Sequence, residues 1–186
     1  MFLRPVLHLQ TWEYAAKDGR SITVREAEVN DAKFLHAGFR SVVEEQCWLP
    51  TFAPNSHVSD WISWIERTRH TREVLLVADV DGEYAGHLSL QPEEWHASQH
   101  VAKLGIIVRK DCRGNGVGRS LMRSGESSAL AKDYSKIILS TFADNEAARN
   151  LYDSLGYRYV GYRKNHFNMP KGYIDEVLME KELVVI

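Results

Sequence analysis

The chain has 186 residues, of which 44% are hydrophobic and 26% are charged, and its formal net charge is −2. This length supports one domain with a well-buried core and is too short for two. The balance of 23 basic and 25 acidic residues gives no basic face, so neither a nucleic-acid-binding domain nor attachment to an anionic membrane is expected. No apolar run approaches the roughly 18 residues that cross a bilayer. The separate cysteines Cys47 and Cys112 favour a reducing cytoplasm over a disulfide framework.

The N-terminal part of the chain predicts one strand and two helices. Residues 21–26 alternate apolar and polar side chains as a strand does. A helix cap at Asn30 or Asp31 precedes apolar residues at helical spacing through Val42, and a similar spacing recurs over residues 56–72. We expect these two helices to lie side by side and to form one wall of a cleft.

The first 20 residues allow two interpretations. Lys17-Asp18-Gly19-Arg20 can turn the segment with Trp12 and Tyr14 back onto the strand at residues 21–26, whereas a loosely ordered tail is the alternative. We expect an N-terminal extension over residues 1–20 and a single domain over residues 21–186.

From residue 74 onward strands and helices alternate. Asp81-Gly82 separates two β-rich runs and is typical of a hairpin, and a third strand continues the sheet in antiparallel fashion. Gly156 ends the last helix, and a turn at residues 170–172 joins two closing strands with clean apolar and polar alternation. The expected elements are strands 74–80, 84–90 and 101–108, helix 117–132, strand 136–142, helix 145–155, and strands 157–168 and 173–183. They predict an α/β fold with a mixed sheet.

Residues 101–118, V-A-K-L-G-I-I-V-R-K-D-C-R-G-N-G-V-G, are the most informative stretch. An apolar strand leads into a glycine-rich turn, and a helix begins at Val117. Glycines let the backbone approach an anion closely, and the helix adds the positive end of its dipole. The spacing lacks both the dinucleotide pattern with its later acidic residue and a P-loop, because Gly118 is followed by Arg119 and Ser120. The stretch therefore predicts a phosphate site of another kind.

The pattern that remains is Arg-x-x-Gly-x-Gly, at Arg113, Gly116 and Gly118. It resembles the acetyl-CoA pyrophosphate loop of the GNAT superfamily of N-acetyltransferases. A second block at residues 143–157, A-D-N-E-A-A-R-N-L-Y-D-S-L-G-Y, is similar to the helix that follows in that family. The two blocks occur in family order, and the resemblance covers roughly residues 21–183. The closing strands resemble the branch that includes ribosomal-protein and polyamine acetyltransferases.

The resemblance implies a mixed, mostly antiparallel sheet that is flanked by helices and splayed at its central strand. In the family the splayed strand pairs with the pantetheine arm, and Gly105 stands just before the residues that would do so here. The loop would bind the pyrophosphate mainly through backbone N–H groups. Acetyl-CoA would then be the acyl donor. The implied cofactor-binding residues are Ile106, Ile107, Val108, Arg113, Gly114, Asn115, Gly116, Val117, Gly118, Arg119 and Asn145.

Tyr152 occupies the position of the family's general acid, which protonates the departing thiolate. A tyrosine at helical spacing with Ala148 and Leu155 is otherwise more often a core residue. No general base stands out, and a water relay is an alternative to the six candidates. The histidines at 87, 96 and 100 lack ligand spacing, so no metal is expected. The candidate bases are Glu44, Glu45, Glu93, Glu94, His96 and His100.

The implied function is direct transfer of the acetyl group to a primary amine, carried by a small amine, an amino acid derivative or a protein N-terminus. We expect the acceptor site between the early helices, the connection at residues 90–99 and the closing hairpin. Neither cysteine has an evident base for a covalent mechanism. A non-catalytic CoA-binding or sensor module on the same fold is the alternative function. A homodimer through sheet edges is an expectation for the oligomeric state. The tryptophans that would either line the acceptor site or fill the core are Trp48, Trp61, Trp64 and Trp95.

Overall fold

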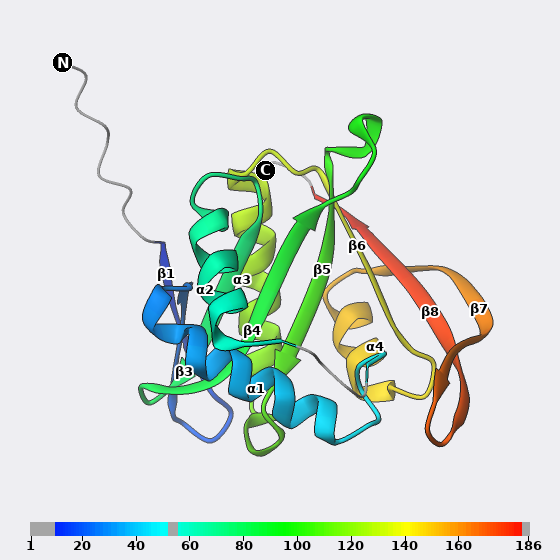
Figure 1. The fold of residues 1–186 in the computed structure, drawn as a ribbon, viewed down its shortest axis with the longest axis horizontal. Helices are drawn as coiled ribbons and strands as arrows, with labels where there is room; N and C mark the ends of the chain where they lie inside the picture. Colours follow the sequence, from blue (N-terminus) through cyan, green and yellow to red (C-terminus); the bar gives the residue numbers. More distant parts are fainter. Residues whose placement is uncertain (1–9, 52–55, 184–186) are drawn as a thin grey trace.

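Eight strands form one sheet in the computed structural model, which describes residues 10–51 and 56–183 (Figure 1). The strands are β1 (Thr11–Ala15), β2 (Ser21–Glu26), β3 (Val74–Val80), β4 (Glu83–Pro92), β5 (Val101–Val108), β6 (Lys136–Phe142), β7 (Arg158–Met169) and β8 (Gly172–Glu182). Their order in the sheet is β1-β2-β3-β4-β5-β6-β8-β7. Neighbouring strands are antiparallel except for the pair β5 and β6, which is parallel. The predicted mixed, mostly antiparallel sheet is confirmed.

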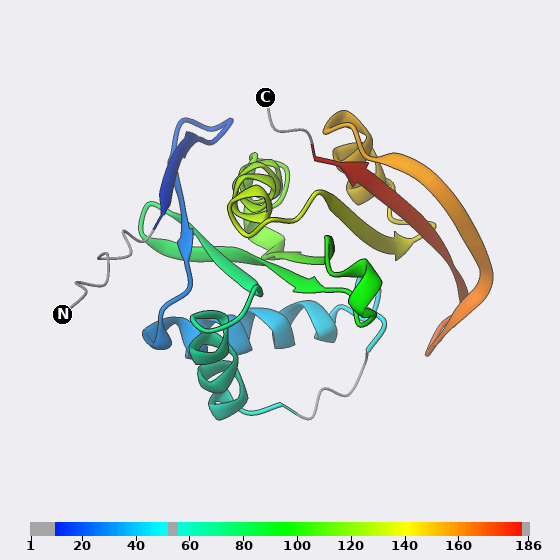
Figure 2. The same ribbon diagram turned by 90° about the horizontal axis from the view of Figure 1, so that it is seen from above.

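Helices cover both faces of the sheet (Figure 2). The α-helices are α1 (Ala32–Glu44), α2 (Val58–Thr68), α3 (Val117–Ala131) and α4 (Glu146–Ser154), and the short 3-10 helices are η1 (Val29–Asp31), η2 (His96–Ser98) and η3 (Lys110–Cys112). Strand β3 is buried on both faces, because Leu76 packs in the core beneath α3 whereas Leu75 and Val77 pack beneath α1 and α2. Such a strand reads as a continuous apolar run rather than as an alternating one.

The sheet is splayed between β5 and β6. The two strands pair only from Val101 opposite Lys136 to Lys103 opposite Ile138, and they separate beyond that point. Strand β5 stays paired with β4 up to Val108. A Cβ atom on Gly105 would lie 3.1 Å from the Ser89 Oγ of β4. The missing side chain of Gly105 therefore relieves a tight contact with β4, while the splay itself opens on the other side of β5.

Of three local predictions, the structure confirms one and corrects two. The Asp81-Gly82 hairpin is present, with φ angles of 50° and 84° at the two residues. The helix expected through residue 72 ends at Thr68, and the Arg72 guanidinium beyond it donates to the backbone carbonyls of residues 99, 132 and 133. The regular alternation expected in the closing strands is interrupted by two register shifts, between Tyr159 and Gly161 and between Arg163 and Phe167.

Residues 11–20 form a hairpin with β2 rather than a tail, and residues 1–9 of the expected extension lie outside the described residues. Strand β1 pairs with β2, and the turn between them is closed by a hydrogen bond from the Ala16 N–H to the Arg20 carbonyl at 2.9 Å. Tyr14 adds a hydrogen bond between its hydroxyl and the Ser124 Oγ of α3, at 2.9 Å. These contacts tie the hairpin to the sheet and to α3. The boundary at residue 20 between an extension and the domain stays a prediction.

Candidate active site

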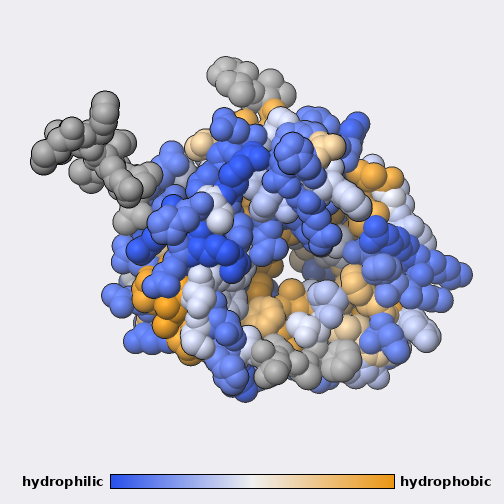
Figure 3. Space-filling model, turned by 45° about the horizontal axis from the view of Figure 1, so that its top comes forward, coloured by the Kyte–Doolittle hydropathy of each residue, from blue (hydrophilic) through white to orange (hydrophobic). Residues whose placement is uncertain are grey.

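A pocket of about 630 Å³ lies where β5 and β6 diverge. Figure 3 shows the surface hollowed there, with apolar residues on the walls of the opening. One wall is the end of β5 together with the glycine loop, the opposite wall is the end of β6 with α4, and residues 48–50 after α1 close a third side. The volume falls in the range of small-molecule sites. The pocket is lined by every predicted cofactor-binding residue except Asn115 and Val117.

The glycine loop presents its backbone to the pocket. Gly114 and Gly116 have φ angles of 80° and 105°, a left-handed region that other residues enter only with strain. In the described part of the chain, no hydrogen bond engages the N–H groups of residues 114–119. Alternating backbone conformations of this kind form a concave cluster of donors, and α3 begins immediately after it at Val117. The loop therefore turns a set of backbone N–H groups, unpaired among the described residues, toward the pocket.

The side chain of Arg113 lines the pocket and is bound by residues of two different elements. Its Nη1 and Nη2 atoms bind the two carboxylate oxygens of Glu45 at 2.8 and 2.6 Å, and its Nε donates to the Val108 carbonyl at 2.9 Å. The guanidinium also lies over the Trp48 ring, with Cζ 5.5 Å from the ring centroid. Arg113 thus joins the end of α1 to the end of β5 across the pocket. The Val108 carbonyl is already occupied by this contact.

Glu45 is poorly placed to act as a general base. The Arg113 guanidinium beside it lowers the pKa of the Glu45 carboxyl, and the Trp48 indole N–H donates to the same group at 2.8 Å. A carboxylate held by a bidentate arginine has little tendency to take up a proton. Its role in the structure is to position Arg113 and Trp48.

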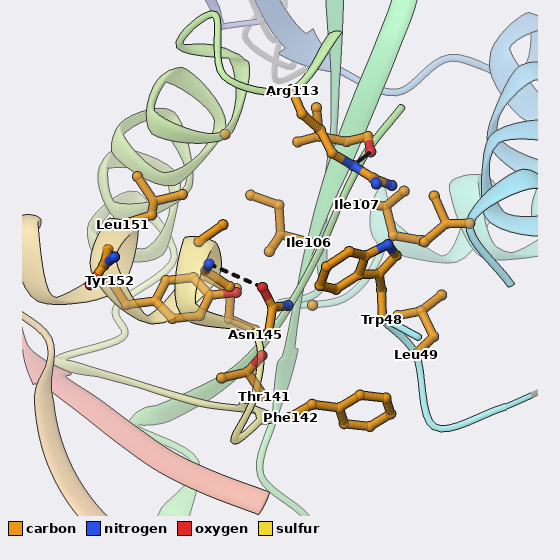
Figure 4. A pocket seen from close by; sticks show the side chains of 18 of the residues that line it. Trp48, Leu49, Ile106, Ile107, Arg113, Thr141, Phe142, Asn145, Leu151 and Tyr152 are labelled. Carbon is orange, nitrogen blue, oxygen red and sulfur yellow. Dashed lines mark hydrogen bonds between the residues drawn. The ribbon is translucent and has the colours of Figure 1, made fainter. Parts of the chain in front are cut away.

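Tyr152 and Asn145 face the pocket from the last turn and from the N-cap of α4, respectively (Figure 4). Tyr152 is 5% exposed, and burial raises the pKa of its hydroxyl to about 12. In the described residues that hydroxyl has no hydrogen-bond partner, so its proton is available to a ligand. The Asn145 Oδ1 accepts from the Ala148 N–H at 3.2 Å and caps α4, which leaves the amide NH₂ of Asn145 for a ligand.

The end of the pocket away from the glycine loop is apolar and aromatic. Trp48 and Leu49 face Tyr152 across it, and Phe142 lies at its base (Figure 4). The Phe142 and Phe167 rings are 5.0 Å apart between centroids, which joins β6 to the closing hairpin. The expectation that the closing hairpin lines this region is thus met by Phe167. Phe142 escaped the sequence analysis, although its place at the end of the strand beyond the splay was a signal for it.

Of the other expected walls of the acceptor site, α1 lines the pocket with Val42, whereas α2 and the connection at residues 90–99 do not contribute to the described lining. Helix α2 contributes no residue to the described lining, because its tryptophans Trp61 and Trp64 pack in the core beneath α1 and α2. The connection at residues 90–99 joins β4 to the end of β5 at which β5 and β6 are still paired, so it is remote from the opening (Figure 1). Trp95 in that connection is 76% exposed. Only Trp48 of the four tryptophans lines the pocket.

None of the six candidate bases lines the pocket as far as the structure describes it. The side chain of Glu44 is 70% exposed, on the outer side of α1. Glu93, Glu94, His96 and His100 belong to the remote connection around η2. Another histidine, His87, is 4% exposed and hydrogen-bonded to the Tyr84 hydroxyl at 2.6 Å, and burial lowers its pKa to about 3. His87 is a neutral core residue.

Three residues of the glycine loop, Asn115, Val117 and Arg119, have structural contacts. Val117 is 1% exposed and belongs to the core beneath α3. The carbonyl of Asn115 accepts from the Lys17 N–H at 3.1 Å, and the Arg119 Nη2 donates to the Ser154 Oγ of α4 at 2.7 Å. Among the described residues we find no cluster of three or more metal-binding side chains. Nor does that part of the chain include a helix long and apolar enough to span a membrane.

Comparison with known proteins agrees with this geometry. The model of the acetyltransferase (GNAT) family matches residues 40–157. The L-amino acid N-acetyltransferase AaaT of Escherichia coli K12 is 28% identical over 165 residues, which cover 86% of this chain and 97% of that protein. The human N-acetylaspartate synthetase is 31% identical over 94 residues, 50% of this chain and 30% of that protein.

A solved structure extends the comparison to the fold. An acetyltransferase from Salmonella typhimurium, determined with its cofactor acetyl-CoA, has a TM-score of 0.82 at 17% identity and covers 89% of this chain and 95% of its own. The predicted family and fold are confirmed, and the alternative of a non-catalytic module is not favoured. The chain belongs to the GNAT acetyltransferase family and is an acetyl-CoA-dependent N-acyltransferase.

Proposed function

We propose that this protein transfers the acetyl group of acetyl-CoA to the α-amine of an amino acid with an apolar side chain. The observation that carries the proposal is a single pocket that runs from an anion-binding loop, past the hydroxyl of Tyr152, to an aromatic end. The loop end suits the phosphates of the donor, and the aromatic end suits an apolar acceptor. The relation to an L-amino acid N-acetyltransferase of nearly the same extent supports this acceptor class.

The donor is held by backbone groups. The free N–H groups of residues 114–119 would bind the pyrophosphate, with the start of α3 contributing about 0.3 to 1 kcal/mol. Beyond Lys103 the edge of β5 that faces the splay has no strand partner, so the backbone of Ile106 can pair with the amide groups of the pantetheine arm. Consecutive strand residues turn their N–H and C=O groups to opposite edges, and the Ile107 carbonyl lies against Gly86 of β4. Val108 can offer this arm its N–H but not its carbonyl, which Arg113 occupies.

Tyr152 would assist departure of the thiolate. The amine nitrogen forms a bond to the acetyl carbon, the carbon–sulfur bond breaks, and the electron pair goes to sulfur. With its pKa raised to about 12, Tyr152 keeps its proton at neutral pH and donates a hydrogen bond to the developing thiolate. The Asn145 NH₂ would orient an amide of the donor or the acceptor beside it. Tyr152 passes its proton to sulfur and is reprotonated from solvent, while the nitrogen releases one proton to solvent. The products are the N-acetylated amine and CoA with its thiol protonated.

The amine must arrive neutral or become neutral before it attacks. The described lining of the pocket includes no aspartate, glutamate or histidine, so no side chain there takes the proton directly. An apolar wall disfavours the charged ammonium form, and water at the open side can accept the proton. The rate at a fixed total amine concentration should therefore rise with pH until the acceptor amine is deprotonated.

Charge separates the three expected acceptor classes. The described lining includes Lys17, Arg113 and Arg119 and no carboxylate. A polyamine carries several positive charges and would find no counter-charge there. An amino acid brings one carboxylate with its amine, which such a lining tolerates. To place its amine beside Tyr152, a protein N-terminus would have to enter the pocket between Trp48 and Phe142.

A panel assay of CoA-thiol release tests the proposal. L-amino acids with apolar side chains should be acetylated with higher kcat/KM than spermidine or a peptide with a free N-terminus. Acetylated product, identified by mass, must accompany the thiol in equal amount. Preference for the polyamine or the peptide would refute the acceptor class. Stabilisation by CoA with no turnover on any amine would favour a non-catalytic CoA-binding module instead.

The quaternary state and the location belong to the same proposal. Strand β7 is an edge of the sheet, and it carries Tyr159, Val160 and Tyr162 at 60%, 53% and 48% exposure, which supports pairing of two copies there. Light scattering on a purified sample distinguishes a dimer from a monomer. The cytoplasmic location and the absence of nucleic-acid and membrane partners stay predictions from composition.

A further inference from the structure

The turn between β1 and β2 lies against the glycine loop. It precedes the part of the chain matched by the family model, which begins at residue 40. The Lys17 N–H donates to the Asn115 carbonyl at 3.1 Å, and a Cβ atom on Gly116 would lie 3.8 Å from the Ile22 Cδ1 of β2. Together with the hydrogen bond between Tyr14 and α3, these contacts fix the turn beside the loop on the same side of the pocket.

Lys17 extends the wall of the pocket at this point. Its side chain is exposed, and it lines the pocket together with Gly114, Gly116 and Arg119. In the ranges that the structure describes, Lys17 forms no ion pair. The acidic residue next to it, Asp18, is bound instead by the Arg20 guanidinium at 3.0 and 2.8 Å. The ammonium group of Lys17 therefore has no ion-pair partner in the described residues that would compete with a ligand.

The other cations of the lining are less free. Arg113 is neutralised by Glu45, with the two groups 2.6 Å apart at their closest. The Arg119 Nη2 donates to the Ser154 hydroxyl on α4. A phosphate at the loop would thus meet backbone N–H groups on one side and the Lys17 ammonium on the other. Opposite charges across a solvent-exposed contact attract most strongly when neither has a competing partner.

We propose that Lys17 binds a phosphate group of coenzyme A and so makes the N-terminal hairpin part of the donor site. The inference rests on the proposed function, because it requires acetyl-CoA in this pocket. Lys17 contributes affinity and not chemistry, since it lies at the loop end and not at Tyr152. Both the pyrophosphate and the 3′-phosphate have the chemistry that an ammonium group recognises, and the experiment separates them.

Titration calorimetry of CoA with three variants tests the proposal. Lys17→Gln keeps the backbone N–H and removes the charge, Lys17→Arg keeps the charge, and Lys171→Gln removes an exposed lysine from the distant turn between β7 and β8. At about 50 mM salt the change Lys17→Gln should weaken CoA binding roughly fivefold or more, whereas the other two variants should bind like the parent. The difference should shrink at about 500 mM salt.

Dephospho-CoA, which lacks the 3′-phosphate, locates the contact. If Lys17→Gln binds it as the parent does, Lys17 contacts the 3′-phosphate, and if the loss persists, Lys17 contacts the pyrophosphate. Equal CoA affinity of the parent and Lys17→Gln at low salt would overturn the role of Lys17 and leave the proposed function intact. No binding of CoA by the parent would overturn both. Circular dichroism of each variant establishes that it is folded before it is titrated.

Discussion

Replacing Tyr152 by phenylalanine should separate its catalytic role from its packing. The ring is 5% exposed and packs 6.1 Å from the Tyr157 ring, so it contributes to the core, while its hydroxyl bonds to no described residue. Removing only that hydroxyl should change the free energy of unfolding by no more than about 1 kcal/mol. Loss of a positioned proton donor should lower kcat by ~10² or more, which corresponds to about 2.7 kcal/mol of transition-state stabilisation.

The matched variants are Tyr152→Ala and Tyr157→Phe. Deleting the buried ring in Tyr152→Ala should cost about 3 to 5 kcal/mol of stability. Tyr157 is 1% exposed and lies outside the described lining of the pocket, so its Phe variant should keep kcat near that of the parent. Steady-state kinetics, CoA titration and thermal melting on the same samples distinguish these effects. A Tyr152→Phe enzyme with full turnover would remove Tyr152 from the chemistry.

Three other changes test the glycine loop, the Glu45 contact and a buried histidine. Gly116 has a φ of 105°, so Gly116→Val should strain the loop and abolish the stabilisation by CoA. Gly172 has a φ of 119° in the turn between β7 and β8, so Gly172→Val should lower the melting temperature but keep the stabilisation by CoA. An equal CoA response in both variants would contradict the loop assignment. Glu45→Gln should cost about 1 to 2 kcal/mol of stability and raise the acceptor KM, with little change in CoA affinity. Glu44→Gln changes an exposed neighbour and should leave both the stability and the acceptor KM unchanged. A large loss of CoA affinity in Glu45→Gln would refute the positioning role. Burial lowers the pKa of His87 to about 3, so the unfolded state takes up the proton first as pH falls. Urea unfolding should therefore show a free energy of unfolding that is about 1.4 kcal/mol lower at about pH 5.5 than at neutral pH, and His87→Gln should lack this decrease. The same pH dependence in the variant and the parent would contradict this account.

The order of elements was predictable because the signals for it are local. Turn chemistry marked the Asp81-Gly82 hairpin, and the run of glycines before Val117 marked the start of α3. The end of α4 was marked by Gly156, whose φ of 84° is the left-handed conformation that ends a helix. Each of these features depends on a few adjacent residues. Their place in the fold follows once the chain order and the resemblance to the family are known.

The contacts around the pocket depended on residues far apart in the chain. The position of Arg113 in the motif predicts a phosphate ligand, and its guanidinium is bound by Glu45 at the end of α1, 68 residues away in the chain. Lys17 reads as part of a turn, and only the pairing of β1 with β2 brings that turn to the loop. The spacing of residues within one segment does not predict contacts between residues of separate segments. The contacts of Arg113 and Lys17 arise from the packing of elements that are far apart in the chain.

Gly105 shows that a correct structural expectation can rest on an indirect cause. The splay was expected at this glycine, yet Gly105 is paired opposite Ser89 in β4 and lacks a side chain because β4 is close. The separation is better explained by β6, which pairs with β8 along its full length from Lys136 to Phe142 but with β5 over three residues. Since strands twist relative to their neighbours, β6 follows β8 away from β5. The aromatic end of the pocket, with Phe142 at its base, is therefore positioned by the closing hairpin and not by the strand that pairs with the donor.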